Sequence, residues 1–253
     1  MTPMASAACA VVAFFSGALN SVAGGGSFLL FPAILAAGVA PVDANVATTI
    51  ALWPASIAST FAYRRELGAE KQLALMFGVV SILGGLAGAE LLLATTDARF
   101  VRVVPWMLLG ATTLFAIGPK FTKKLGGGSK TWARLSAALA FQVLVAGYGG
   151  YFGGGMGILM LASFTLLGIQ SIHEANALKS LLGVLINGAA ACAFFAAGRG
   201  DLRSTWPIVV MAVGGGYLGA RTARRIDASR VRTTTVALAW GTTVAVCATF
   251  WHR

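Results

Sequence analysis

Two runs of three glycines, Gly24 to Gly26 and Gly153 to Gly155, interrupt apolar stretches in the two halves of this chain of 253 residues. They lie about 130 residues apart, and other short patterns return at nearly the same shift. These further matches are GGLAGA at 84–89 with GGYLGA at 215–220, and DAN at 43–45 with EAN at 174–176. Self-similarity at so long a period marks a duplicated architecture. The sequence therefore predicts two structural repeats that are broken at equivalent points.

Composition indicates a membrane protein. Hydrophobic residues make up 57% of the chain and charged residues 11%, whereas a soluble domain carries about 25% charged residues. The net charge of +11 comes from lysines and arginines in the polar gaps between apolar runs, as topology signals do. We therefore expect membrane lipid, and not nucleic acid, as a partner. The three cysteines are far apart, without the Cys-x-x-Cys spacing of a metal site, and we expect no metal and no cofactor.

Each half contains five apolar segments, and the one that follows the glycine run is only about half of the roughly 20 residues that a spanning helix needs. The segments of the first half are Met4 to Val22, Phe28 to Gly38, Ala44 to Tyr63, Leu73 to Leu93 and Val101 to Gly118. Those of the second half are Trp132 to Gly150, Gly157 to Gly168, Ala175 to Gly198, Ser204 to Ala220 and Val231 to Phe250. The predicted fold is an all-α polytopic membrane protein of about ten membrane segments, in two five-segment repeats with glycine-broken hairpins.

The expected domain limits follow from these segments. We place the first membrane repeat at 1–120, a polar, glycine-rich linker at 121–131 and the second repeat at 132–253. Most lysines and arginines fall on one side when each segment counts as one crossing, so that side, which includes the linker, is expected to be cytoplasmic. An odd number of segments per half gives the repeats inverted topology and places both termini outside the cytoplasm. The alternative is that each glycine hairpin is a re-entrant loop that returns to its own face of the membrane. This alternative leaves the inverted relation of the two repeats unchanged.

The glycine runs need a physical reason. Three glycines in succession let the backbone leave helical geometry, which membranes tolerate only inside protein or beside a watery cavity. Close helix packing is the alternative role of glycine, and it accounts for the repeated GGLAGA and GGYLGA stretches. A broken turn before a short helix leaves the first N–H groups, at Ser27 and Met156, without intrahelical partners. Such ends carry partial positive charge and bind anions, so we expect a small anionic substrate where the hairpins converge.

We expect the substrate-binding site to combine the two glycine runs with polar residues in the apolar segments. The candidates are Asn20, Gly24, Gly25, Gly26, Ser27, Thr48, Thr49, Gly153, Gly154, Gly155, Met156, Gly157, Asn176 and Lys179. Lys179 either binds the anion or snorkels to the interface. Thr48 and Thr49 either line the pathway or bond back to their own helix. Asn176, which matches Asn45 in the first half, either caps a helix or contacts the ligand.

Both copies of the glycine motif carry a family resemblance. The first copy is GALNSVAGGGS at 17–27 with Pro32, Gly38 and ANVATT at 44–49, and the second is GYGGYFGGGMG at 147–157 with ANALK at 175–179. The chain resembles the TauE/SafE family of sulfite exporters and organosulfonate permeases over nearly its whole length. The resemblance implies an integral inner-membrane permease for sulfite, sulfoacetate or a related sulfur-containing or carboxylated anion. Asn20 and Ser21 depart from the plainer stretch of many members, which bears on the anion that fits.

These features predict a secondary transporter, and not an enzyme, that works by alternating access around a midplane site between the hairpins. No nucleotide-binding loop is present, so a gradient must supply the energy. The alternative is a carboxylate or a cation on the same scaffold. A distant alternative is an intramembrane hydrolase using Ser27 and His173, but the second glycine run lacks the serine. The direction, the coupling ion and the oligomeric state, with a homodimer among the options, stay open.

A bulky side chain in either glycine run should abolish transport without blocking membrane insertion. We expect this for Gly25→Val and Gly154→Val, because a β-branched residue restricts the backbone that the broken turn needs. Flux in proteoliposomes and the yield in membranes measure the two effects separately. Unaltered flux in both variants would contradict a midplane site at the hairpins.

Overall fold

A computed structural model describes residues 1–67, 71–125, 132–169 and 171–222, together with a few single residues nearer the carboxyl terminus. Those single residues are Thr233, Val236, Ala237, Trp240, Gly241, Thr243, Val244 and Val246. Within this part of the chain all regular secondary structure is helical, which confirms the predicted class. The tenth predicted segment, Val231 to Phe250, lies mostly outside the described residues.

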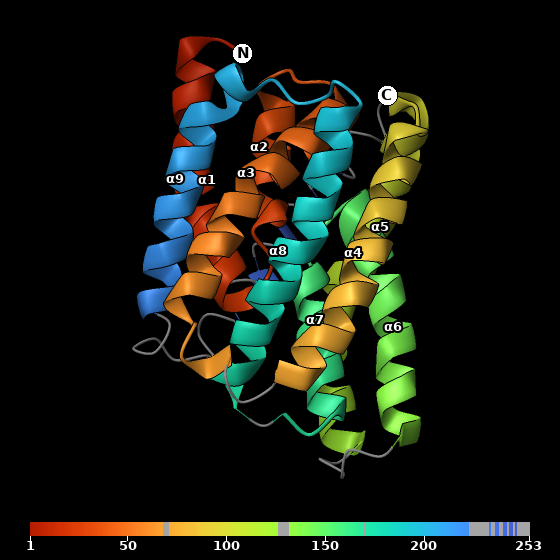
Figure 1. Cartoon of the computed structure of the whole chain (residues 1–253). Coiled ribbons are helices and arrows are strands. Elements are labelled where there is room, and N and C mark those ends of the chain that lie inside the picture. The colour runs from red at the N-terminus through yellow and green to blue at the C-terminus, as the bar shows by residue number, and fades with distance from the viewer. Residues whose placement is uncertain are drawn as a thin grey trace.

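The helices follow the predicted apolar segments closely (Figure 1). They are α1 (Pro3–Ala23), α2 (Ser27–Ala36), α3 (Pro41–Ala62), α4 (Lys71–Leu93), α5 (Asp97–Leu125), α6 (Trp132–Tyr151), α7 (Met156–Leu166), α8 (Ile172–Ala196) and α9 (Leu202–Thr222). The two short ones, α2 with 10 residues and α7 with 11, follow the glycine runs as expected. Helix α5 continues to Leu125, inside the predicted linker 121–131, and the rest of that linker lies outside the described residues.

Three of the described helices are long and apolar enough to cross a membrane by length and composition. They are Pro3–Ala23, Gln72–Leu93 and His173–Ala196, which belong to α1, α4 and α8. Helix α2 is apolar but too short to cross. These helices fit a membrane-embedded protein.

Local sequence signals explain where the main helices begin and end. At the start of α1 the Thr2 hydroxyl accepts a hydrogen bond from the Ala5 amide, at 3.2 Å, and proline follows the cap. The helix ends where Gly24 takes a left-handed conformation with φ of 76°, and its amide bonds to the Asn20 carbonyl. Helix α8 begins in the same manner as α1, with the Ser171 hydroxyl accepting from the Glu174 amide.

Each glycine run turns the chain back on itself. The thiol of Cys9, near the start of α1, lies 3.5 Å from the carbonyl oxygen of Ala33, near the end of α2. Helix α2 therefore returns toward the end of the molecule where α1 begins, and α3 starts there (Figure 1). In the second half α7 packs against α6, and the Tyr148 hydroxyl donates across this turn to the Gly154 carbonyl. Both breaks thus form helical hairpins of unequal arms.

The helices pack in groups that combine the two halves of the sequence. Helix α9 packs against α1 and α3, and α4 packs against α6 and α8. We call α1, α2, α3 and α9 the first helix group, and α4, α6, α7 and α8 the second. Helices α3 and α8 pack on each other at the centre of the molecule, where the groups meet (Figure 1). Each group thus takes one helix from the opposite half.

Glycine allows the closest of these helix contacts. A Cβ atom built on Gly88 would lie 2.1 Å from the Gly147 carbonyl oxygen, where α4 crosses α6. One built on Gly215 would lie 1.8 Å from the Phe14 carbonyl oxygen, where α9 crosses α1. The GGLAGA and GGYLGA stretches therefore have the packing role that the sequence predicted for them.

Gly88→Ala should lower the free energy of unfolding by about 1 to 3 kcal/mol, because its methyl group must push α4 away from α6. Thermal unfolding of the detergent-purified protein measures the effect. Gly110→Ala is the matched control, since a Cβ at Gly110 meets nothing within 4 Å, and alanine favours a helix by about 1 kcal/mol. Equal melting temperatures of the Gly88 variant and the natural protein would contradict the packing role.

Candidate functional site

The two broken hairpins touch at their tips. A Cβ atom built on Gly24 would lie 2.6 Å from the Cα of Gly157, and one built on Gly157 would lie 2.7 Å from the Cα of Gly24. A Cβ on Gly153 would lie 3.9 Å from the Ser27 hydroxyl oxygen. Gly24 and Gly153 share the same left-handed φ of 76°, which favours glycine. The sequence placed these glycines at equivalent points, and the fold brings the two points together.

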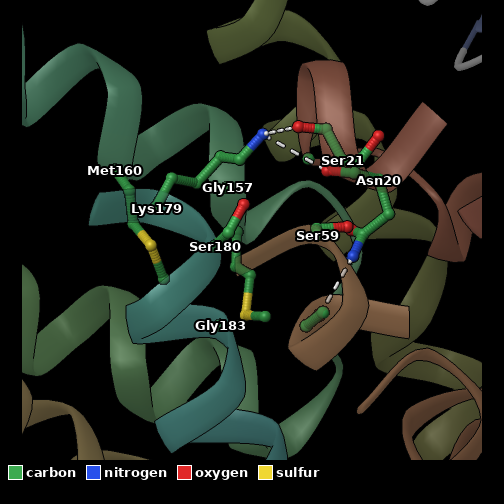
Figure 2. Close-up of a pocket in the computed structure, with 11 residues that line it drawn as sticks. Asn20, Ser21, Ser59, Gly157, Met160, Lys179, Ser180 and Gly183 are labelled. Carbon is green, nitrogen blue, oxygen red and sulfur yellow. Dashed lines mark hydrogen bonds between the residues drawn. The ribbon is translucent and has the colours of Figure 1, made fainter. Parts of the chain in front are cut away.

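A narrow cavity lies beside this contact, between α1, α3, α7 and α8 (Figure 2). Its lining residues are Asn20, Ser21, Gly24, Ser56, Ser59, Met156, Gly157, Met160, Lys179, Ser180 and Gly183. Its volume of about 10 Å³ is close to the smallest that holds one water molecule. Four of the lining residues are serines, and the other polar side chains are those of Asn20 and Lys179.

Lys179 brings a positive charge to this cavity. The residue is 4% exposed, and its Nζ donates to the Ser21 carbonyl at 2.9 Å, the Asn20 carbonyl at 3.2 Å and the Asn176 Oδ1 at 2.9 Å. Figure 2 shows the side chain extending from α8 to the last turn of α1. The snorkelling alternative is therefore wrong, since the ammonium group points into the protein. Within the described part of the chain no carboxylate forms an ion pair with Lys179.

A free backbone amide adds to the positive character of the cavity. At the start of α7 the Met156 amide bonds to the Gly153 carbonyl and the Ile158 amide bonds to the Gly155 carbonyl. The Gly157 amide between them has no partner among the described residues. Because the first N–H groups of a helix carry partial positive charge, this end of α7 favours an anion.

Serine hydroxyls form the α3 wall of the cavity. Ser56 accepts from the Asn20 side-chain amide at 3.3 Å and donates to the Leu52 carbonyl, one turn back on its own helix. Ser59 bonds in the same way to the Ala55 carbonyl at 2.8 Å. Each hydroxyl proton can turn about its Cβ–Oγ bond to donate to a molecule in the cavity, in exchange for the bond to the backbone carbonyl. The wall therefore offers neutral donors opposite the charge of Lys179.

The other broken helix has a related but neutral arrangement. The side-chain amide of Asn45, on α3, donates to the carbonyl of Tyr151, the last residue of α6, at 2.8 Å. Asn45 is equivalent to Asn176, so each central helix holds the end of the opposite broken helix. Thr48 stands where α8 has Lys179, and its hydroxyl bonds back to the Ala44 carbonyl at 2.7 Å. Only one of the two equivalent places carries a charge.

The structure brings together some of the predicted site residues and leaves others outside the cavity. Those that line it are Asn20, Gly24, Met156, Gly157 and Lys179, and Asn176 reaches it through its bond to the lysine. The remaining candidates, Gly25, Gly26, Ser27, Thr48, Thr49, Gly153, Gly154 and Gly155, are not among its lining residues. Asn176 is not a helix cap, because Ser171 has that role in α8. Thr48 follows the alternative of a bond to its own helix.

Sequence reasoning missed several of the lining residues. They are Ser56, Ser59, Met160, Ser180 and Gly183, whereas Ser21 enters the sequence analysis only through its departure from the family pattern. Ser56 and Ser59 lie three residues apart in an apolar helix, a spacing that puts both on one face and could have identified them. The hydrolase alternative gains no support, since within the described residues no hydrogen bond joins Ser27 to His173. No group of residues suited to a metal ion occurs in the same part of the chain.

Similarity to known proteins extends over most of the chain. The family model described as Sulfite exporter TauE/SafE matches residues 9–246. The probable membrane transporter protein YfcA of Escherichia coli K12 is 26% identical over 224 residues, which cover 87% of this chain and 79% of that protein. A probable membrane transporter protein of Haemophilus influenzae is 26% identical over 227 residues, covering 88% and 85%. No solved structure matches the chain. The extent of the family match, with the helical fold and its apolar helices, shows that this chain belongs to the TauE/SafE family and is a membrane transporter.

Proposed function

We propose that this transporter moves a small anion, sulfite or an organosulfonate such as sulfoacetate, through the cavity between its two broken hairpins. The observation that carries the proposal is the buried ammonium group of Lys179, which lies beside that cavity without a carboxylate partner in the described residues. A buried charge without a counter-ion costs several kcal/mol, and an anion in the cavity would offset this cost. Membership of the family described as Sulfite exporter TauE/SafE supports sulfite among the small anions.

The other polar groups around the cavity support an anion over a cation. The Gly157 amide, which has no partner among the described residues, and the amino end of α7 supply partial positive charge, and the hydroxyls of Ser56, Ser59 and Ser180 can turn to donate to oxygen atoms of an anion. A cation would meet the lysine charge at close range. The cation alternative on this scaffold is therefore disfavoured, whereas a carboxylate would satisfy the same donors.

We propose that the transport cycle moves the first helix group against the second. The cavity walls come from α1 and α3 on one side and from α7 and α8 on the other, so separation of the groups would enlarge it. A volume of about 10 Å³ is too small for sulfite, which fits a closed form of the cavity. The moving bodies in this proposal are the two mixed groups and not the two halves of the sequence.

The proposed topology has two inverted repeats in the inner membrane, with about ten segments and with the 121–131 linker in the cytoplasm. It is supported by the exchange of equivalent helices, in which α9 packs on α1 as α4 packs on α6. Helices α3 and α9 both end at the end of the bundle opposite the amino terminus (Figure 1). Arg64 and Arg65, which follow α3, and Arg221, near the end of α9, are exposed. This end is proposed to be cytoplasmic and both termini external. Anion export would then release about 2.3 kcal/mol per charge at 100 mV.

Flux of anions into or out of proteoliposomes tests the proposed function. We expect saturable movement of one of sulfite, sulfoacetate, thiosulfate, sulfate or a short carboxylate under an imposed potential. Lys179→Met should lower that flux at least about tenfold, because the cavity loses its positive charge. Arg102→Ala, which removes an exposed charge from α5, should leave the flux unchanged. No flux for any anion, or an undiminished flux in Lys179→Met, would refute the proposal.

The contact between the hairpin tips gives a second prediction. Gly157→Ala places a methyl group 2.7 Å from the Gly24 Cα, so the tips must separate, and we expect flux to fall at least about tenfold. Gly147→Ala is the control, because its methyl group would meet only the Gly84 carbonyl oxygen at 4.0 Å and should leave flux near that of the natural protein. Equal flux in both variants would show that the tip contact is not needed for transport.

A further inference from the structure

We infer that the carboxyl end of α1 forms a cation-binding site, and that the ammonium group of Lys179 fills it in place of a free coupling cation. In transporters built from broken helices, the carboxyl ends of the half-helices and their unpaired carbonyls are where Na⁺ or a proton is held. Here the same kind of end holds a side chain of the protein. The transport part of this inference rests on the proposed function, and the binding part does not.

The site consists of three oxygens that surround one nitrogen. The Asn20 and Ser21 carbonyls belong to the last turn of α1, and Asn176 contributes Oδ1 from α8. The last carbonyls of a helix carry partial negative charge and lack intrahelical partners. The Asn20 carbonyl also accepts from the Gly24 amide, whereas among the described residues the Ser21 carbonyl accepts only from Lys179. Oxygens of this kind, buried at a helix end, bind small hard cations.

The geometry fits the charged form of the lysine. An ammonium group has three N–H donors and no acceptor, and Lys179 has three oxygen acceptors within 3.2 Å of its Nζ. A neutral amine has only two donors and would direct its lone pair at one of these oxygens. The arrangement is therefore complementary to a full positive charge, which is also what a Na⁺ ion would supply.

The equivalent position in the other half shows that a neutral donor is enough to satisfy a carbonyl at the end of a broken helix. There the neutral side chain of Asn45 satisfies the Tyr151 carbonyl, and Thr48 takes the position of the lysine. The lysine thus adds a fixed charge at only one of two equivalent ends, on the side of the cavity. A transporter with this tethered cation has no need of a free one, so its anion flux should not depend on Na⁺.

Removal of the lysine side chain should create a site for a free cation. We expect Lys179→Ala, purified in detergent, to melt at a lower temperature in choline medium and to be stabilised in a saturable manner by Na⁺ or methylammonium. The natural protein should not respond to either cation. Lys179→Met is the matched control, because an apolar side chain of similar length fills the space and should prevent the response. A Lys179→Ala protein that is folded but insensitive to both cations would overturn the site.

A flux measurement, made first on the natural protein, tests the role of the site in transport. We expect the natural transporter to give the same anion flux in Na⁺ and in choline medium, and Lys179→Ala to lose at least about tenfold in choline and regain most of it with Na⁺ or methylammonium. A natural flux that requires Na⁺, or an undiminished Lys179→Ala flux in choline, would overturn the inference. If the natural protein moves no anion while Lys179→Ala still shows the melting response, the proposed function fails and the cation site remains.

Discussion

The structure depends on one constraint, that backbone groups exposed by a broken helix inside a membrane must find partners within the protein. Helices α1 and α6 both end at a glycine run, so some of their last carbonyls, including those of Ser21 and Tyr151, need partners from other helices. The central helices supply the partners: Lys179 on α8 donates to the Ser21 carbonyl, and Asn45 on α3 donates to the Tyr151 carbonyl. Because α3 and α8 each reach across to the other half of the sequence, these bonds also tie the two halves together.

Glycine serves the fold in two different ways. At Gly24 and Gly153 it supplies a left-handed backbone, which ends a helix and lets the chain turn back. At Gly88 and Gly215 it supplies the absence of a side chain, which lets helix backbones pack at close range. Gly157 belongs to the second kind, although it lies in a broken hairpin, because its neighbour is the backbone of Gly24. A duplicated scaffold of small residues thus forms both the breaks and the contacts that hold them in place.

The chemistry of the cavity is less symmetrical than the scaffold around it. Lys179 and Thr48 occupy equivalent positions, but one is a buried cation with three acceptors and the other bonds to its own helix. The cavity adjoins the charged position. A duplicated fold can therefore keep the broken helix in both copies and carry the charged side chain that selects a substrate in one copy only.

The sequence by itself determined the helical membrane class, the places of the two breaks and the short helices that follow them, because composition and local backbone preference act over a few residues. It also identified Lys179, since a lysine in an apolar run is rare. Only the tertiary structure decided what that lysine binds, because Ser21 lies 158 residues away in the chain. The serine wall of α3 and the exchange of α4 and α9 between the halves were also decided there. Those features depend on which helix faces pack together, and neither periodicity nor composition fixes the partner of a helix face.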